Sequence, residues 1–312
     1  MREVFGDQLR ENVNLAPYTS SRIGGPAEFL LEVRSSEELA LKAQQLWKMD
    51  MPFRILGGGS NVLISDKGVF GVVILNYARE VTFLDSETGL RVTAESGASL
   101  GSVSRRSVER GWTGLEWAAT IPGTIGGAVI GNAGAHGGEI ANCLEVAKIL
   151  QRNAQIEAWP VEKFEFGYRD SVLKRFPRQV VVLSATFRLS TTNKDLAKRK
   201  VKEFVAYRQK TQPTGPSWGS MFKNPPGKIA GRLIDTAGLK GLQIGGARVS
   251  AKHANFFVNL GDASASDVLR LIQLVRDEVA KRFGIYLELE VELFGDWDLD
   301  EIGDLAVLGE GS

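Results

Sequence analysis

Two glycine-rich segments limit what this chain can fold into more than any other feature. The first is Gly57-Gly58-Gly59-Ser60-Asn61, which follows a short apolar stretch, and the second is Ile121-Pro122-Gly123-Thr124-Ile125-Gly126-Gly127-Ala128. Glycine supplies 35 of the 312 residues, more than the roughly 7% of average proteins. Because glycine lacks Cβ, backbone N–H groups in such turns can approach an anion closely. The segments therefore indicate either a phosphate site or two tight turns in a β-rich domain.

The spacing of these glycines disfavours the two commonest nucleotide-binding loops. Neither segment contains G-x-x-x-x-G-K-S/T, the pattern of a P-loop. Gly57 and Gly59 begin the G-x-G-x-x-G pattern of a Rossmann dinucleotide site, but Val62 occupies the position of its third glycine. We therefore expect any phosphate bound here to be held by a different fold.

The composition gives no overall electrostatic signature. The chain has 38 Lys and Arg against 37 Asp and Glu, a net charge of +1, which disfavours a nucleic-acid binder that relies on a basic field. The lone Cys143 cannot form an internal disulfide and does not group with the two histidines, so we expect no metal site and a reducing, cytoplasmic location. No apolar run reaches the ~18–20 residues of a membrane span, and we expect neither a signal peptide nor membrane attachment.

Hydrophobic patterning changes near residue 190. Short strand patterns dominate before this point, and longer helical patterns follow it. We therefore predict one domain of residues 1–190, a smaller α+β domain of residues 191–298 and a disordered acidic tail of residues 299–312. The expected helices cover residues 35–48, 99–110, 191–210, 229–237 and 266–283. The expected strands cover residues 53–56, 62–64, 72–75, 81–84, 91–94, 146–150, 156–159, 180–189 and 285–293.

The predicted last strand carries three carboxylates on one face. Apolar residues of 285–293 alternate with Tyr286, Glu288, Glu290 and Glu292, so the opposite face would be core. A solvated face is the simplest interpretation of the three acids. Like charges repel, however, and a cleft could retain one of these carboxyls for acid–base chemistry.

Two further residues are candidates for chemistry. Arg169 lies in a loop-like segment, where its rigid, charged guanidinium would suit a carboxylate or an enolate, although alone it could be a surface arginine. Ser220 lies in Gly219-Ser220-Met221-Phe222-Lys223-Asn224-Pro225 with no histidine base nearby, which favours a proton donor or plain polar surface over a nucleophile. Lys223 and Asn224 could stabilise the alkoxide that a donating serine leaves.

The helix predicted to end near Lys210 is strongly basic. Residues 194–210 include seven Lys or Arg, which would suit either a solvated helix face or a nucleic-acid patch. No aromatic residues alternate with these charges in the way that single-stranded nucleic-acid sites require. We therefore interpret the basic face as solvated and expect no nucleic-acid partner.

Several motifs together resemble one family, the UDP-N-acetylenolpyruvoylglucosamine reductases. The resemblance covers roughly residues 11–295, in the shorter of the family's two types. Two positions depart from the family pattern: His136 stands where Tyr is usual, and Thr120 where an apolar residue or glycine is usual. The motifs are Ala16-Pro17-Tyr18-Thr19, Arg22-Ile23-Gly24-Gly25-Pro26-Ala27, the two glycine segments, Asn132-Ala133-Gly134-Ala135-His136-Gly137, Tyr168-Arg169-Asp170-Ser171, Gly219 to Pro225 and His253-Ala254-Asn255-Phe256.

This resemblance implies an α+β fold, with an FAD-binding domain of vanillyl-alcohol-oxidase (PCMH) type beside a smaller substrate-binding domain. It implies an NADPH-dependent flavoenzyme that reduces UDP-N-acetylglucosamine enolpyruvate to UDP-N-acetylmuramate in peptidoglycan precursor synthesis. We expect this enzyme to be a monomer. FAD would be held noncovalently, not attached through His136. The FAD-binding residues that it implies are Gly57, Gly58, Gly59, Ser60, Asn61, Pro122, Gly123, Thr124, Gly126 and Gly127.

The resemblance also assigns catalytic roles. Flavin reduced by NADPH would give hydride to the enolpyruvyl double bond. Arg169 and a protonated Glu290 would stabilise charge on the substrate carboxylate, and Ser220 would protonate the other carbon. Glu290 fits the family's carboxyl best, with Glu288 as the alternative. The substrate-binding residues would be Asn224 and, at the nucleotide diphosphate, Lys210.

Two other functions compete with this one. A hydroxy-acid or alcohol oxidase on the same flavin fold would explain the glycine segments, but not residues 219–225 or the last strand. A binding module that holds a nucleotide without catalysis would explain the glycine turns alone. A yellow protein would exclude the module, and reoxidation of reduced flavin by the enolpyruvyl substrate would exclude the oxidase.

Overall fold

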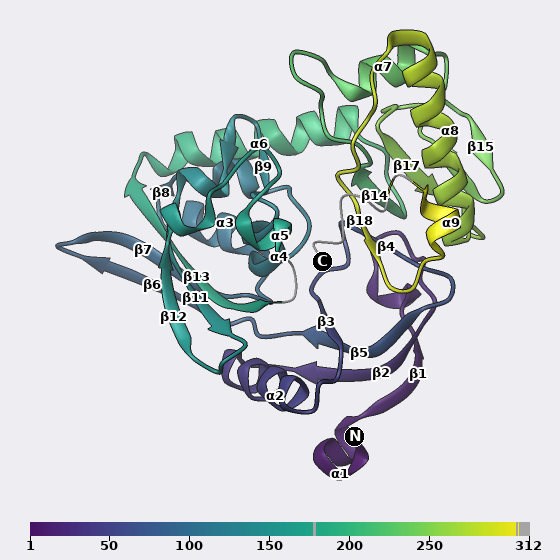
Figure 1. Cartoon of the computed structure of the whole chain (residues 1–312). Helices are drawn as coiled ribbons and strands as arrows, with labels where there is room; N and C mark the ends of the chain where they lie inside the picture. The colour runs from purple at the N-terminus through teal and green to yellow at the C-terminus, as the bar shows by residue number, and fades with distance from the viewer. Residues whose placement is uncertain (177–178, 304, 306–312) are drawn as a thin grey trace.

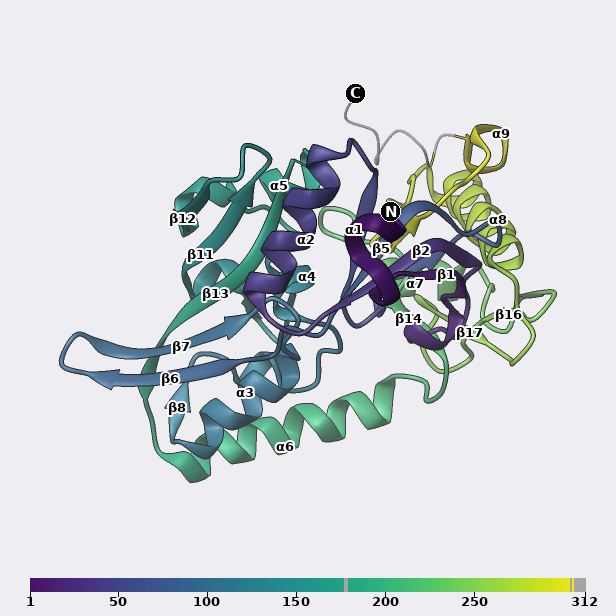
Figure 2. The same cartoon turned by 90° about the horizontal axis from the view of Figure 1, so that it is seen from below.

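The computed structural model describes residues 1–176, 179–303 and 305. Two β-sheets and their helices form one region, and a third sheet with two helices forms another (Figure 1). A long helix, α6 (Lys194–Thr211), runs from the first region to the second (Figures 1 and 2). The molecule therefore has two differently built regions, which α6 joins.

The first sheet has the order β1-β2-β5-β3, with β1 antiparallel and the other three strands parallel. Helix α2 (Ser36–Lys48) begins at Ser35, whose hydroxyl accepts the N–H of Glu38, as the capping pattern predicts. The amino-terminal helix is α1 (Arg2–Phe5). The strands are β1 (Arg10–Asn14), β2 (Pro26–Val33), β5 (Val69–Asn76) and β3 (Phe53–Leu56).

The second sheet is antiparallel, in the order β12-β11-β13-β7-β6. Helix α2 lies between the first two sheets, because its Leu39, Ala43 and Leu46 share a core with Leu31 and Leu183. The opposite face of the second sheet is covered by α3 (Leu100–Glu109) and α4 (Ile125–Ile130). The strands are β12 (Ile156–Pro160), β11 (Leu144–Gln151), β13 (Val180–Thr191), β7 (Gly89–Glu95) and β6 (Val81–Ser86), with short elements β8 (Trp112–Thr113), β9 (Gly134–Ala135), β10 (Gly138–Glu139) and α5 (Val172–Arg175).

The third sheet is covered by α7 (Ala230–Thr236) and α8 (Ala265–Phe283). Helix α8 begins with a capping box between Ser264 and Asp267 and ends at Gly284, whose φ of 65° is the left-handed stop predicted there. The apolar positions predicted for α8 are all buried: Val268, Leu271, Ile272, Val275 and Val279. The strands, in sheet order, are β14 (Ser217–Ser220), β17 (Phe256–Asn259), β16 (Ala247–Val249) and β15 (Gln243–Ile244).

The end of the chain returns to its beginning. Strand β18 (Glu292–Phe294) pairs in parallel with β4 (Val62–Ile64), which directly follows the first glycine segment. Ile23 and Leu63 also belong to the core under α8. Core packing therefore crosses residue 190, and the division into domains 1–190 and 191–298 remains a proposal.

Three expectations need correction. The last strand is not continuous over 285–293: only β18 and one bridge, between Phe222 and Leu289, are formed, because no strand lies alongside the rest. The tail over 299–312 is not wholly disordered. Residues Leu299–Ile302 form α9, and Ile302 is buried together with Leu305 against the core of α8. Residues 304 and 306–312 lie outside the described part.

The third correction concerns α6 and the loop after it. Leu196 and Val205, two apolar positions of the predicted helix, are 43% and 38% exposed, because α6 crosses between two regions instead of covering a sheet. The segment of residues 211–220, for which neither a helix nor a strand was predicted, contains β14. The other predicted helices and strands are present.

No described helix is both long and apolar enough to cross a lipid bilayer.

Candidate active site

The two glycine segments lie against each other. A Cβ at Gly58 would stand 3.1 Å from Cα of Gly123, and one at Gly123 would stand 2.8 Å from Oγ of Ser60. Gly59 has a φ of 56°, and a Cβ there would overlap the carbonyl oxygen of Tyr18. Side chains at these positions would push the turns apart. The glycines are therefore needed for the close approach of two backbone segments.

The same turns leave backbone donors free. Within the described part of the chain, the N–H groups of residues 57–61 have no acceptor, and neither do those of Gly123, Thr124 and Gly127. Unpaired N–H groups gathered at glycine turns form a concave anion site. The residues present thus fit a phosphate-bearing cofactor, which supports the predicted FAD site.

A cavity of about 400 Å³ adjoins the second turn at Pro122 and is lined by Arg105 and Arg208. Arg105 donates to the carbonyl oxygen of Ala119 at 2.6 Å, and Arg208 donates to that of Thr120. Neither guanidinium is paired with a carboxylate of the described residues, so the cavity carries uncompensated positive charge. This charge also suits the phosphates of a dinucleotide.

Gly127→Val tests the cradle. A Cβ at Gly127 would meet only Oγ1 of Thr124, at 3.8 Å, whereas one at Gly126 would meet Cβ of Ser96 at 3.0 Å. The protein has room for the first change, so a loss of cofactor would arise from the turn and not from misfolding. We expect Gly127→Val to be purified colourless with a Tm near the parental value. Gly231→Ala, whose new Cβ would meet His253 at 3.4 Å, is the control and should stay yellow.

Arg169 lies at the corner of a tight turn. Gly167 and Asp170 exchange two backbone hydrogen bonds, of 3.1 and 3.2 Å, and Arg169 between them has a φ of 55°. Its guanidinium donates to Oε1 of Glu290 at 3.0 Å, to the carbonyl oxygen of Asn132 at 3.3 Å and to that of Gly134. Three acceptors thus hold the guanidinium of Arg169 in place, and one of them is the carboxyl of Glu290, 121 residues later in the chain.

Glu290 differs from the two acids beside it. Its side chain is 21% exposed, against 59% for Glu288 and 58% for Glu292. Burial raises the pKa of Glu290, and Arg169 opposes this shift. A carboxyl with a raised pKa next to an arginine can act as a hydrogen-bond donor as well as an acceptor.

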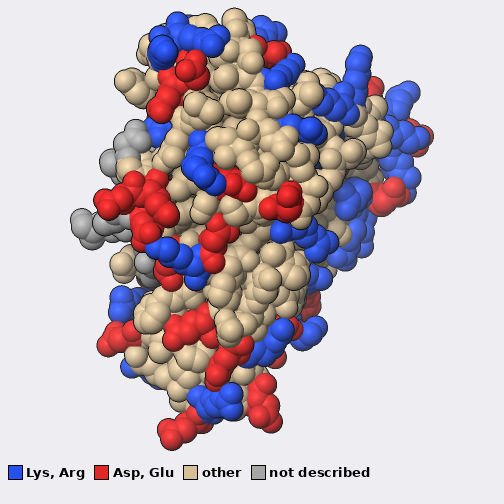
Figure 3. Space-filling view, turned by 90° about the vertical axis from the view of Figure 1, so that its right-hand side faces the viewer, with Lys and Arg blue, Asp and Glu red and all other residues tan. Residues whose placement is uncertain are grey.

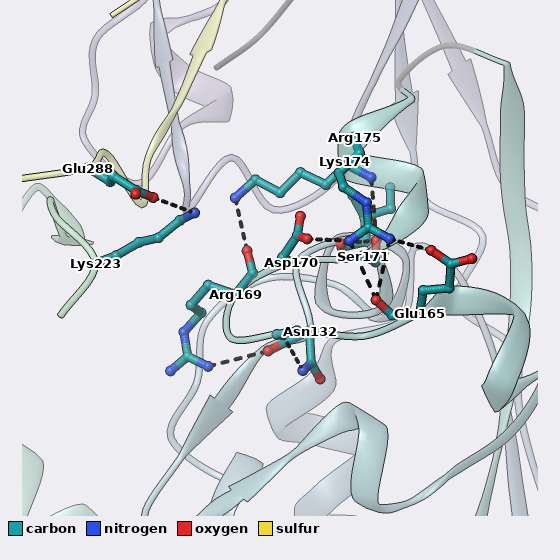
Figure 4. Close-up of polar contacts among 11 residues, drawn as sticks. Asn132, Glu165, Arg169, Asp170, Ser171, Lys174, Arg175, Lys223 and Glu288 are labelled. Atoms are coloured by element: carbon teal, nitrogen blue, oxygen red, sulfur yellow. Dashed lines mark hydrogen bonds and ion pairs between the residues drawn. The ribbon is translucent and has the colours of Figure 1, made fainter. Parts of the chain in front are cut away.

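Glu288 and Glu292 have partners outside this pair. Glu288 accepts from Nζ of Lys223 at 3.1 Å (Figure 4), and Glu292 lies 3.8 Å from Arg54. Both carboxylates are exposed, which agrees with the solvated-face interpretation for two of the three acids. The choice of Glu290 as the catalytic carboxyl stays a prediction that this arrangement supports.

Ser220 is brought next to the Glu290 segment by backbone pairing. It ends β14 opposite Phe256. Its neighbour Met221 accepts the N–H of Glu290 at 2.9 Å through its carbonyl oxygen. Asn255 holds this turn, because its side chain bonds both backbone groups of Phe222. Ser220 therefore lies in the chain segment that pairs with the Glu290 segment, and its place in one catalytic site with Glu290 and Arg169 stays a prediction.

The residues predicted to bind ligands have different surroundings. Asn61 donates through Nδ2 to the carbonyl oxygen of Glu290 at 2.9 Å, which ties the first glycine turn to the catalytic segment. Asn224 accepts the N–H of Ala230 at the start of α7 through its Oδ1 at 3.0 Å, and its Nδ2 remains available to donate to a ligand. Lys210 is exposed in the last turn of α6 and pairs with no acid of the described residues.

Sequence reasoning gave no role to two residues here. Asn132 bonds Gly167 through Nδ2, and Lys174 bonds the carbonyl of Arg169 at 3.2 Å. The sequence showed only an Asn before Ala133-Gly134 and a Lys five residues after Arg169, and the left-handed φ of Asn132 appears only in the structure. His136 stacks on Phe204 with ring centroids 4.0 Å apart, so its ring packs against α6.

Charge on the outer surface is mixed. On the face shown in Figure 3, acidic side chains gather toward one edge and basic side chains toward the other. No single sign of charge covers this face. The site chemistry must therefore be explained by the local groups above.

Comparisons with known proteins agree with this site. Residues 27–157 match an FAD binding domain, and residues 209–294 match the C-terminal domain of UDP-N-acetylenolpyruvoylglucosamine reductase. The chain is 43% identical to the reductase of that name from Rubrobacter xylanophilus over 90% of this chain and 94% of that protein. It is 43% identical to the one from Chlamydia felis over 93% and 95%.

A solved structure is also similar. The crystal structure of UDP-N-acetylenolpyruvylglucosamine reductase from Thermus caldophilus covers 92% of this chain and 99% of its own, with 37% identity and a TM-score of 0.77. The fold and the matched domains define an FAD-containing oxidoreductase and confirm the predicted fold class. Within that class, the chain belongs to the UDP-N-acetylenolpyruvoylglucosamine reductase family.

Proposed function

We propose that this enzyme uses NADPH to reduce UDP-N-acetylglucosamine enolpyruvate to UDP-N-acetylmuramate, a step of peptidoglycan precursor synthesis. The names of its relatives support the substrate. The observation that carries the proposal is the pairing of Arg169 with a half-buried Glu290 beside Ser220. An oxidase would not need this set, because an oxidised product requires no proton donor to carbon.

The protein's own groups have separate tasks in this reaction. Bound FAD supplies the transfer of two electrons, as hydride, from NADPH to the enolpyruvyl group. Arg169 and protonated Glu290 would hold the substrate carboxylate and stabilise the negative charge that develops on it. Ser220 would give its proton to the carbon that does not receive hydride, and Lys223 would stabilise the alkoxide. Lys210 and Asn224 would bind the nucleotide sugar.

The raised pKa of Glu290 gives an expected pH dependence. Because the protonated carboxyl is the active form, the rate of reoxidation by substrate should fall as pH rises through that pKa. Glu290→Gln should lose this limb of the profile. Reduction by NADPH should not show it. Anaerobic stopped-flow measurements of each half-reaction across pH test this assignment. If Glu290→Gln still shows the fall in reoxidation rate with rising pH, another group is responsible and the assignment is wrong.

One titration tests the function as a whole. The purified protein should be yellow, and acid denaturation should release the chromophore, since we propose noncovalent FAD. NADPH should bleach the flavin without oxygen, and the enolpyruvyl substrate should restore its colour. Reoxidation by a hydroxy acid's keto product but not by the enolpyruvyl compound would favour an oxidase. A parallel titration with NADH tests the preference for NADPH.

We infer that the enzyme is a cytoplasmic monomer. The lone Cys143 is buried, and burial raises the pKa of its thiol to about 12, so it is unsuited to disulfide exchange. This supports a compartment where disulfides are not needed. Sedimentation equilibrium should give the mass of a single chain, and a dimer mass would contradict the monomer.

A further inference from the structure

Lys174 lies on α5, the single helical turn that follows Arg169. The side chain of Ser171 accepts the N–H of Lys174 and donates to the carbonyl oxygen of Ile130 at 2.6 Å. Helix α5 is thereby anchored to the end of α4. Its position relative to the second glycine turn, where α4 begins, is therefore fixed.

Arg169 occupies a backbone position that disfavours it. It is the third residue of the turn from Gly167 to Asp170, and its φ of 55° is the conformation for which such turns usually take Gly or Asn. The left-handed conformation is unfavourable for a residue that carries a Cβ, and it persists only where the surroundings hold it. Something must therefore hold the peptide between Arg169 and Asp170.

The ammonium of Lys174 contacts this peptide. Its Nζ donates to the carbonyl oxygen of Arg169 at 3.2 Å, and Figure 4 shows the side chain extended across the turn toward that atom. Lys174 forms no ion pair with a carboxylate of the described residues. The charged groups around it are Lys223, Glu292, Glu290 and Asp170, and burial lowers its pKa.

We propose that Lys174 is a positioning residue for the reaction: its ammonium holds the peptide after Arg169 in the left-handed turn that aims the guanidinium at Glu290. Its positive charge also acts on the Glu290 carboxyl. Nothing in the sequence or comparisons assigns Lys174 a role. The inference deepens the proposed function, because Arg169 and Glu290 are the residues on which that function rests.

Substitution of Lys174 should therefore affect one half-reaction. We expect Lys174→Met to slow reoxidation by substrate by about a hundredfold, the scale of a catalytic group displaced by about 1 Å. Reduction by NADPH should stay near the parental rate, since Arg169 has no task in it. Loss of the positive charge should also move the Glu290 limb of the pH profile to higher pH. Lys174→Arg, which keeps a charged donor, should recover most of the rate.

The matched control is Arg175→Met in the same helix. Arg175 pairs with Glu165 at 2.8 Å and with Asp170, but it does not touch the carbonyl of Arg169 (Figure 4). If α5 matters only for folding, both variants should slow both half-reactions alike, and the proposal is overturned. If Lys174→Met does not fold, Lys174→Gln is measured in its place. A Lys174→Gln enzyme with the parental reoxidation rate and an unshifted pH dependence of that rate would also overturn the proposal. A parental enzyme that fails to reduce the enolpyruvyl substrate would instead refute the proposed function.

Discussion

Ser220→Ala should slow the reoxidation of flavin by substrate by roughly a hundred- to ten-thousandfold, the loss typical of removing a positioned acid. Its reduction by NADPH should keep the parental rate. Ser220 lies at the end of β14, beside the segment that carries Glu290, and it has no proton to give while NADPH reacts. Anaerobic stopped-flow measurement of each half-reaction separates the two effects.

Two further variants show whether the hydroxyl itself acts. Ser220→Cys keeps a proton donor at the same place and should regain part of the lost rate. Ser217→Ala changes a serine of the same strand, opposite Val258, and should leave both half-reactions unchanged. Equal slowing of reduction and reoxidation in Ser220→Ala would mean that the residue serves folding or flavin binding.

Glu290→Gln should slow reoxidation strongly, with reduction by NADPH and thermal stability nearly unchanged. Gln keeps the shape and one donor, but it does not provide the ionisable carboxyl that now pairs with Arg169 at 3.0 Å. Removing one electrostatic stabiliser of the transition state typically costs 10²–10³ in rate. Single-turnover rates at fixed pH measure the effect.

The neighbouring acids provide matched controls. Glu288 and Glu292 are more than half exposed, and Glu292→Gln should change stability by no more than about 0.5 kcal/mol, with little effect on rate. Glu288→Gln should also be mild, because its exposed carboxylate pairs with Lys223 and not with Arg169. A large kinetic defect in Glu288→Gln with a mild one in Glu290→Gln would show that the wrong carboxyl was chosen.

Local patterns predicted much of this fold. Helix α8 follows from its apolar spacing and from Gly284 at its end, because these signals act within a few residues. The last strand was overestimated for a related reason. Alternation correctly predicted that Leu287 and Val291 are buried. A strand also needs a neighbour, however, and the segment has only the short pairing of residues 292–294 and one bridge at Leu289.

Charge misled the prediction for the tail. The acids of residues 296–312 suggested disorder, yet Ile302 and Leu305 bury apolar side chains against the core of α8. Two apolar residues in an acidic segment were too weak a signal to indicate a helix. Their burial depends on a surface that sequence alone does not display.

The candidate site could be predicted only in part. Arg169 and Glu290 are 121 residues apart, and no spacing rule joins them, so the family resemblance supplied both. Lys174 and Asn132 act through the backbone of other residues, and such roles appear only when the chain is folded. Residue type predicts what a side chain can do, whereas its partner depends on the tertiary structure.

The pairing of β4 with β18 has a consequence for how the protein is made. Asn61, in the first glycine turn, bonds the carbonyl of Glu290, 229 residues later, and β18 joins β4 just beyond it. At the usual 5–20 residues per second, a ribosome needs about 10–50 s to make the intervening chain. During that time the first glycine turn lacks its contacts with Glu290 and β18. We therefore expect FAD to be captured only after release of the whole polypeptide, so that loading follows synthesis instead of guiding it.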